Sequence, residues 1–156
     1  MKRTIILLTA LAALIISTPM FAAATANLDV KATVSANCTI SAVAMDFGSY
    51  DPLSATNAIA TGTLNVACTK GAAATISLGN GGNFTTIRRM ASPSGDFLEY
   101  SLYQPNGTTA WDTTNIYTYN STTKASQAFT VNGKAIAGQN ITVGAYADQV
   151  VATINY

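Results

Sequence analysis

The side chains that carry most enzyme chemistry are scarce in this sequence. It contains no histidine, two cysteines and seven carboxylates that are scattered along the chain. Without histidine, the Ser-His-Asp and Cys-His arrangements that activate a nucleophile cannot form. Asp96 and Glu99 are near enough in sequence to work as an acid and a base, as in glycosidases, but such residues are more often solvated groups in turns and at strand edges. We expect no catalytic residue, no enzyme activity, no cofactor and no small-molecule substrate.

The remaining candidate binding motifs also favour structural roles. The run Gly79–Gly82 lacks the Lys and Ser/Thr of a phosphate-binding loop, and no helical pattern follows it, so we interpret it as a loop between strands. Arg88 and Arg89 are too few for a nucleic-acid patch, and one of them is expected to pair with a carboxylate or bind backbone carbonyls. Trp111 and Tyr103 are candidates for a sugar-stacking platform, although core or subunit packing is the commoner role.

The N-terminus has the layout of a secretory signal peptide. A basic start, Met1-Lys2-Arg3, precedes an apolar run of about 12 residues and then the small residues Ala22–Ala24. A signal anchor is the alternative, but the run is shorter than the ~20 residues of a spanning helix. We therefore predict that residues 1–24 form a signal peptide, with cleavage after Ala24 or after Ala26.

The mature chain is the size of one ordinary domain. Removing 24 of the 156 residues leaves 132, and losing Lys2 and Arg3 leaves six basic side chains against seven acidic ones, a net charge of −1. There is no basic stripe for nucleic acid and no polybasic segment for anionic lipid. Charged residues make up only 10% of the chain, against the ~25% of typical globular proteins, which suits a surface that packs against copies of itself.

Cys38 and Cys68 are expected to form one disulfide. An even number of cysteines in an exported chain indicates a structural bridge, because the compartment outside the cytoplasm is oxidising. A metal site is not expected, since there is no histidine and no further thiol.

Alternation of apolar and polar residues dominates the chain after the signal, which predicts β-strands. The expected runs are 28–35, 38–42, 64–68, 74–78, 98–102, 116–119, 129–131 and 150–156, and each cysteine falls on the apolar face of its run. Turn signals separate the runs, at Phe47-Gly48, Asp51-Pro52, 79–82, 93–95, 105–107, Asn132-Gly133 and Gly138. Many short strands in about 130 residues predict an all-β sandwich in a single domain.

The two ends of the mature chain suggest how copies would join. The first run lies outside the disulfide loop and is therefore free to leave the domain, whereas the last run reaches the final residue and leaves no strand to follow it. A free strand at one end and a missing strand at the other is the layout that strand donation requires. The first run presents Leu28, Val30, Ala32 and Val34 on its apolar face, and the last presents Val150, Ala152, Ile154 and Tyr156.

An ordered set of short motifs resembles the spore coat protein U domain family, which includes the major subunits of archaic chaperone–usher pili. The set covers essentially the whole mature chain. Its members are Leu28–Lys31 leading to Ser35–Thr39, Phe47–Pro52, Gly62–Thr69, Tyr100–Tyr103 with Trp111, Ala137–Gln139, Gly144–Asp148 and Ile154–Tyr156.

The resemblance implies an incomplete immunoglobulin-like sandwich whose final strand is supplied in trans. Residues 25–36 would be the donor segment, and residues 37–156 the pilin domain. A periplasmic chaperone would bind the last strand, 150–156. At an outer-membrane usher, the donor strand of another subunit, 27–35, would then replace the chaperone. Partners are thus a chaperone, an usher and copies of the chain in a head-to-tail fibre exported through the periplasm to the cell surface.

The resulting hypothesis is a structural pilus subunit that supports adhesion and biofilm formation. One alternative is a secreted coat protein of a spore or cell surface, after which the family is named. A minor adaptor or tip adhesin is a further alternative, although an adhesin usually needs an additional receptor domain, and 132 residues leave room for one domain only.

Overall fold

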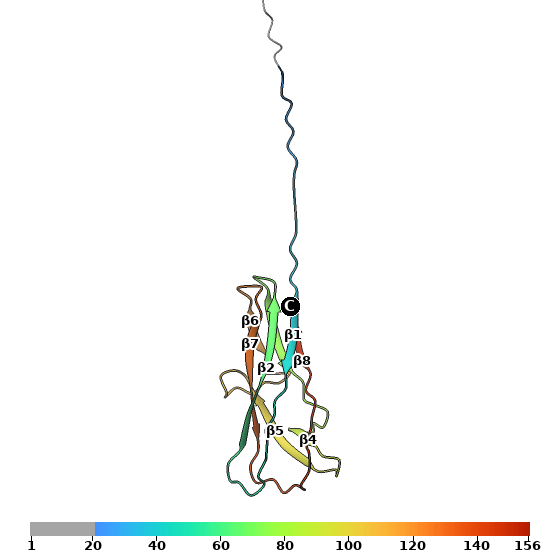
Figure 1. The fold of residues 1–156 in the computed structure, drawn as a ribbon, viewed down its shortest axis with the longest axis vertical. Coiled ribbons are helices and arrows are strands. Elements are labelled where there is room, and N and C mark those ends of the chain that lie inside the picture. Colours follow the sequence, from blue (N-terminus) through green and yellow to red (C-terminus); the bar gives the residue numbers. More distant parts are fainter. Residues whose placement is uncertain (1–20) are drawn as a thin grey trace, which may run out of the picture. The chain divides into compact units, whose positions relative to one another are not determined.

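The alternating runs form strands in the structure. The computed structural model describes residues 21–156, and all regular elements in this part of the chain are β-strands (Figure 1). They are β1 (Cys38–Val43), β2 (Ala58–Cys68), β3 (Ala73–Leu78), β4 (Arg88–Ala91), β5 (Phe97–Tyr103), β6 (Tyr117–Asn120), β7 (Gln127–Ala135) and β8 (Ala152–Asn155).

Two antiparallel sheets enclose one core, as the sequence predicts. The larger sheet has the strand order β1-β2-β7-β5-β4 and the smaller has the order β6-β3-β8. Their inner faces are apolar because alternate residues of each strand point inward. Val66 of β2, Ile76 of β3 and Trp111 are completely buried at the centre of this core. The all-β, immunoglobulin-like sandwich is therefore confirmed.

Trp111 belongs to the core and is not part of a sugar platform. Its side chain has no exposed surface, and its Nε1–H donates to the carbonyl of Ile76 at 2.9 Å. The ring packs against Tyr117, with the ring centroids 5.6 Å apart. The interpretation that Trp111 packs in the core is confirmed.

Arg88 satisfies backbone carbonyls inside the domain. This nearly buried side chain donates to the carbonyls of Leu78, Gly79 and Trp111 at 2.7–3.1 Å. Burial lowers the pKa of its guanidinium. The neighbouring Arg89 donates to the carbonyl of Asn83 and lies 4.2 Å from the centre of the Phe97 ring. Of the two roles predicted for this pair, a salt bridge to a carboxylate or binding to backbone carbonyls, the structure shows the second.

Two features of the larger sheet differ from the sequence prediction. Asn132-Gly133 is not a turn, because both residues lie inside β7. A side chain at Gly133 would overlap Met45 and Phe47, so glycine is present here to make room rather than to turn the chain. The strand β4 was not predicted, since Arg88 and Arg89 interrupt any apolar alternation at Arg88–Ala91.

The N-terminal segment, residues 21–33, forms a unit separate from residues 34–156. No strand forms in this segment, and the predicted strand at 28–35 therefore has no ladder within the single chain. The predicted signal peptide, residues 1–24, lies outside the described residues except for its last four.

Candidate functional site

An apolar cavity opens between the free edges of the two sheets. β1 ends the larger sheet and pairs only with β2, while β8 ends the smaller sheet and pairs only with β3. The two strands lie side by side in Figure 1 and are in contact. Beyond this contact, the residues that follow β1 and those that precede β8 border a cavity of about 530 Å³.

The floor of this cavity is the hydrophobic core itself. Leu64 and Val131 of the larger sheet and Leu78 of the smaller sheet are buried and line it. One wall consists of residues 42–47 and the other of residues 146–152. An apolar opening that reaches the core beside two unpaired strand edges is a place where a further strand could be added.

A second cavity adjoins the first. It has a volume of about 520 Å³ and shares Met45, Phe47, Met90 and Tyr146 with its neighbour. Its other lining residues come from loops 46–52 and 141–144 and from Leu98 of β5. We call the two cavities together the groove.

Met45 and Phe47 occupy a hollow that two glycines create in the larger sheet. An added Cβ at Gly133 would lie 2.9 Å from Cζ of Phe47 and would overlap the thioether of Met45. An added Cβ at Gly62 would lie 3.3 Å from Cβ of Met45. The rings of Phe47 and Tyr100 are in edge contact, with centroids 6.2 Å apart. The glycines thus let the first wall of the groove sit directly on the sheet.

The predicted last strand, 150–156, corresponds to the shorter strand β8 and the residues that flank it. Val150, Ala152 and Ile154 are partly buried and pack against the core, and the first two line the groove. Tyr156 is instead 57% exposed, and its hydroxyl lies 3.4 Å from Oδ1 of Asn37. Tyr156 therefore lies at the end of the domain where β1 starts.

Sequence reasoning missed both groove walls outside β8. The first wall had a usable signal, because apolar residues alternate at Val43, Met45 and Phe47, one position out of phase with the inward-facing residues of β1. The second wall had no such signal, because residues 141–149 show no alternation of apolar and polar residues. In the structure, their strand pairing is limited to one isolated bridge, between Ala147 and Ala91.

A carboxylate ties the second wall to the rest of the domain. Asp148 Oδ2 accepts a 2.5 Å hydrogen bond from the Tyr100 hydroxyl, and Oδ1 accepts one of 2.8 Å from the Gly82 N–H. Tyr100 is 4% exposed, and its burial, with the contact to Asp148, strongly raises the pKa of its hydroxyl. The loop 79–82, which was interpreted as a connection between strands, therefore also receives this carboxylate.

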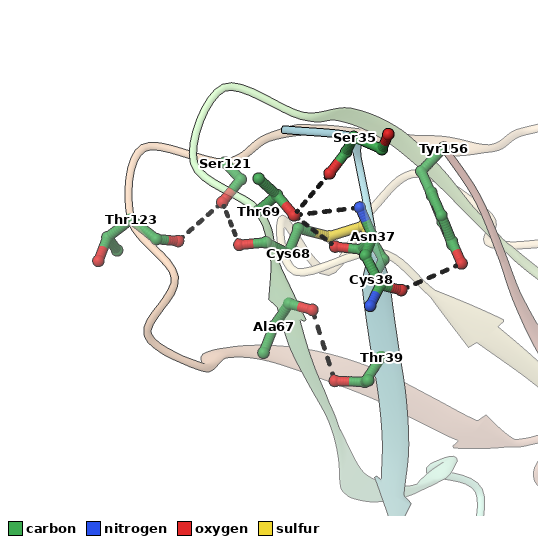
Figure 2. The surroundings of a disulfide bond; sticks show 10 residues. All are labelled: Ser35, Asn37, Cys38, Thr39, Ala67, Cys68, Thr69, Ser121, Thr123 and Tyr156. Carbon is green, nitrogen blue, oxygen red and sulfur yellow. Dashed lines mark hydrogen bonds between the residues drawn. A yellow bond between two sulfur atoms is a disulfide. The ribbon is translucent and has the colours of Figure 1, made fainter. Parts of the chain in front are cut away.

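The predicted disulfide is present and fixes the start of β1 (Figure 2). Cys38 and Cys68 are directly opposite residues of β1 and β2, with an S–S length of 2.02 Å, and both are buried. Next to it, the Asn37 N–H donates to the Thr69 hydroxyl at 3.1 Å and the Thr69 N–H donates to the Asn37 carbonyl at 2.8 Å. The Thr69 hydroxyl in turn contacts the Ser35 carbonyl at 3.4 Å. Covalent and polar contacts thus hold residues 35–38.

The predicted donor side chains are exposed to solvent. Leu28, Val30 and Val34 are 87%, 84% and 80% exposed, and Ala32 is also exposed. Exposure of three branched apolar side chains is unfavourable for a free segment. Their insertion into a groove of another copy stays a prediction.

The candidate acid and base do not form a site. Neither Asp96 nor Glu99 lines the groove. Asp96 accepts hydrogen bonds from the hydroxyl and the backbone N–H of Thr142, which lower the pKa of its carboxyl. Residues 21–156 contain no cluster of three or more potential metal-ligating side chains. Within the same range, no helix long and apolar enough to cross a membrane was found.

Comparison with known proteins identifies the family. The model of the Spore Coat Protein U domain matches residues 24–153. Protein U of Myxococcus xanthus is 34% identical, and the match covers 99% of this chain and 98% of Protein U. The chain belongs to the spore coat protein U domain family. The resemblance stated from the sequence motifs is thus confirmed.

A solved structure shares the fold of this family member. It is the CsuC–CsuE chaperone–tip adhesion subunit pre-assembly complex from the archaic chaperone-usher Csu pili of Acinetobacter baumannii. The TM-score is 0.63 at 22% identity, and the match covers 80% of this chain and 40% of that chain. At this identity the likeness concerns the fold.

Proposed function

We propose that this spore coat U domain protein is a structural, non-enzymatic pilus subunit that polymerises by donor-strand complementation. The observation that carries the proposal is the groove, which opens beyond the contact of β1 with β8 and is lined by partly buried apolar side chains such as Met45, Phe47 and Val150. A strand of another copy would pair with both edges and cover the floor. Completion of the sandwich would also remove two edges that are templates for aggregation.

The N-terminal segment has the length and the side chains for this role. From Leu28 to Val34 an extended chain spans about 20 Å, at ~3.3 Å per residue. Burial of Leu28, Val30 and Val34 would contribute about 1.5–3 kcal/mol each, before the entropy cost of ordering the strand is subtracted. The small side chain of Ala32 would need only a shallow part of the groove. We assign these four side chains to the donor strand, and Val150, Ala152, Ile154 and Tyr156 to the acceptor strand or its end.

The assembly route that we infer comes from the family and from the likeness to a chaperone–subunit complex, and the open groove is compatible with it. A subunit with an open groove exposes apolar surface, so it needs a temporary partner before polymerisation. We infer a periplasmic chaperone, an outer-membrane usher and then copies of the chain, with residues 1–24 as signal peptide, 25–36 as donor segment and 37–156 as pilin domain. Donation from head to tail does not close on itself and therefore builds a fibre at the cell surface, which would support adhesion and biofilm formation.

Deletion of residues 27–35 tests this function. Wild-type protein should form multimers that resist SDS without heating and collapse to monomer on boiling, whereas the deletion variant should stay monomeric and still bind its chaperone. Fibres that persist without residues 27–35 would contradict the donor assignment.

A coat protein is the second candidate, and the match of the Spore Coat Protein U domain to residues 24–153 favours it. The two candidates differ in export and shape. A pilus subunit requires a chaperone and an usher and yields filaments in electron micrographs of material sheared from cells. A coat protein would form a layer instead.

A further inference from the structure

The second wall of the groove lacks a sheet of its own. Residues 146–150 precede β8, and the only strand pairing among them is the bridge of Ala147 to Ala91, with N–O distances of 2.9 and 3.0 Å. Yet all five residues line the groove. A wall with so little backbone pairing would be free to fold into the groove, since that would bury its partly exposed apolar lining, such as Met45, Phe47 and Met90, without any partner.

Asp148 is placed to prevent this collapse. Its two oxygens contact Tyr100, which lies on β5 of the larger sheet, and Gly82, which lies in the loop after β3 of the smaller sheet. A single side chain therefore joins the wall to both layers of the sandwich. Because both acceptor atoms are engaged at 2.5 and 2.8 Å, the position of the wall is fixed in two directions.

The glycine loop is shaped to receive this carboxylate. Gly81 has a φ of +85°, which disfavours any other residue, and a Cβ at this position would overlap the Asp148 carboxylate. A Cβ at Gly82 would lie 3.5 Å from Oδ1 of the same group. The buried guanidinium of Arg88 is a further interaction partner of Asp148 through its charge. The loop is thus shaped to fit the side chain at position 148.

We propose that Asp148 is a positioning residue that holds the groove open before a strand enters it. The proposal rests on the proposed function in one respect, namely that the groove receives a strand. It adds that the acceptor is preformed and that one carboxylate, remote from the β1 edge, controls how readily a donor or a chaperone strand binds.

The test uses the full mature chain carrying Val30→Asp, so that its own donor strand is disabled, refolded with the disulfide formed. Asp148→Ala, Asp148→Asn and Asp112→Ala are made in this background. Asp112 is the matched control, because its carboxylate also accepts backbone hydrogen bonds, from Thr114 and Asn115, but does not line the groove. Uptake of a fluorescent peptide with the sequence 27–35 and backbone hydrogen exchange are measured, with urea unfolding to record stability.

The expected results separate positioning from a general loss of stability. Asp148→Ala should bind the peptide about tenfold more weakly than Asp112→Ala at comparable stability, the loss of roughly one charged hydrogen bond. Amides 146–150 should exchange about tenfold faster in Asp148→Ala, with β2 and β7 unchanged. Asp148→Asn should restore most of both properties, because an amide can accept from Gly82 and donate to the Tyr100 oxygen.

Two outcomes would overturn the proposal. One is hydrogen exchange at 146–150 in Asp148→Ala that equals exchange in the control, whatever the peptide does. The other is equal peptide binding by Asp148→Ala and Asp112→Ala when the parent chain does bind the peptide. A parent chain that takes up no peptide while its wall still loosens in Asp148→Ala would count against strand donation, and would support the role of Asp148 in holding the wall.

Discussion

A charge on the apolar face of the donor strand should abolish assembly, and Val30→Asp is the sharpest such change. Val30 is 84% exposed, so nearly the full gain from burying a valine, about 1.5–3 kcal/mol, is available on insertion and is lost in the variant. The carboxylate adds the cost of placing an unpaired charge against an apolar floor, which amounts to several kcal/mol even after relaxation. The sum is at least about 4 kcal/mol, or roughly a thousandfold in affinity.

Thr33→Asp is the matched control for this prediction. It introduces the same charge three residues along, on the opposite face of the alternating segment. Peptides with the sequence 27–35 that carry either change are competed against the unmodified peptide for the groove, and the corresponding full chains are examined for SDS-resistant multimers. Val30→Asp should fail in both assays and Thr33→Asp should retain most activity in both. Equal effects of the two changes would refute the assignment of Leu28, Val30, Ala32 and Val34 to the buried face.

Three further predictions concern the domain that carries the groove. Replacing Cys38 and Cys68 with serine opens a covalent loop whose ends are 30 residues apart, and chain entropy then predicts a loss of about 3.6 kcal/mol in the free energy of unfolding. Urea titration of oxidised and variant protein measures this, and a change below about 1 kcal/mol would contradict it. Arg88→Lys should cost about 2–4 kcal/mol, because an ammonium cannot reach the same three carbonyls, and an unchanged urea midpoint would show that they find other partners. Hydrogen bonds from the backbone of Asn115 lower the pKa of Asp112, so its contribution should be present above the ordinary pKa of 3.8 and disappear as pH falls through the lower folded value. The difference in stability between wild type and Asp112→Asn should therefore shrink in acid, and a constant difference from about pH 6 to pH 2 would disprove the linkage.

The sequence predicted those parts of the fold that depend on local alternation. Leu64, Val66 and Cys68 lie on the inner face of β2 as expected, because one buried face is enough to impose a period of two. The strand β4 could not be predicted, since Arg88 turns inward to bind carbonyls that only the folded chain brings together. The sequence wrongly predicts a turn at Gly133 for a related reason, because the side chains that this glycine accommodates, Met45 and Phe47, lie about 90 positions earlier.

Only part of the groove could likewise be predicted from the sequence. Its last-strand side, at Val150 and Ala152, followed from alternation, while Asp148 looked like any solvated carboxylate in the sequence. Its partners, Tyr100 and Gly82, are 48 and 66 residues away, and no local pattern relates them. Contacts of this kind arise from packing between layers, which only the three-dimensional structure supplies.

The contacts around residues 35–38 have a mechanical consequence. In a fibre joined by strand donation, tension between neighbours would enter each domain through this short stretch of backbone. The disulfide lies at the first residue of β1 (Figure 2) and would pass the pull directly to β2, which pairs with β7 from Ala58 to Val66. The hydrogen bonds between β1 and β2 would then not carry this load and would not break in sequence. A fibre under tension would therefore be expected to fail where the inserted strand leaves its groove, and not by unfolding of the domain that carries this strand.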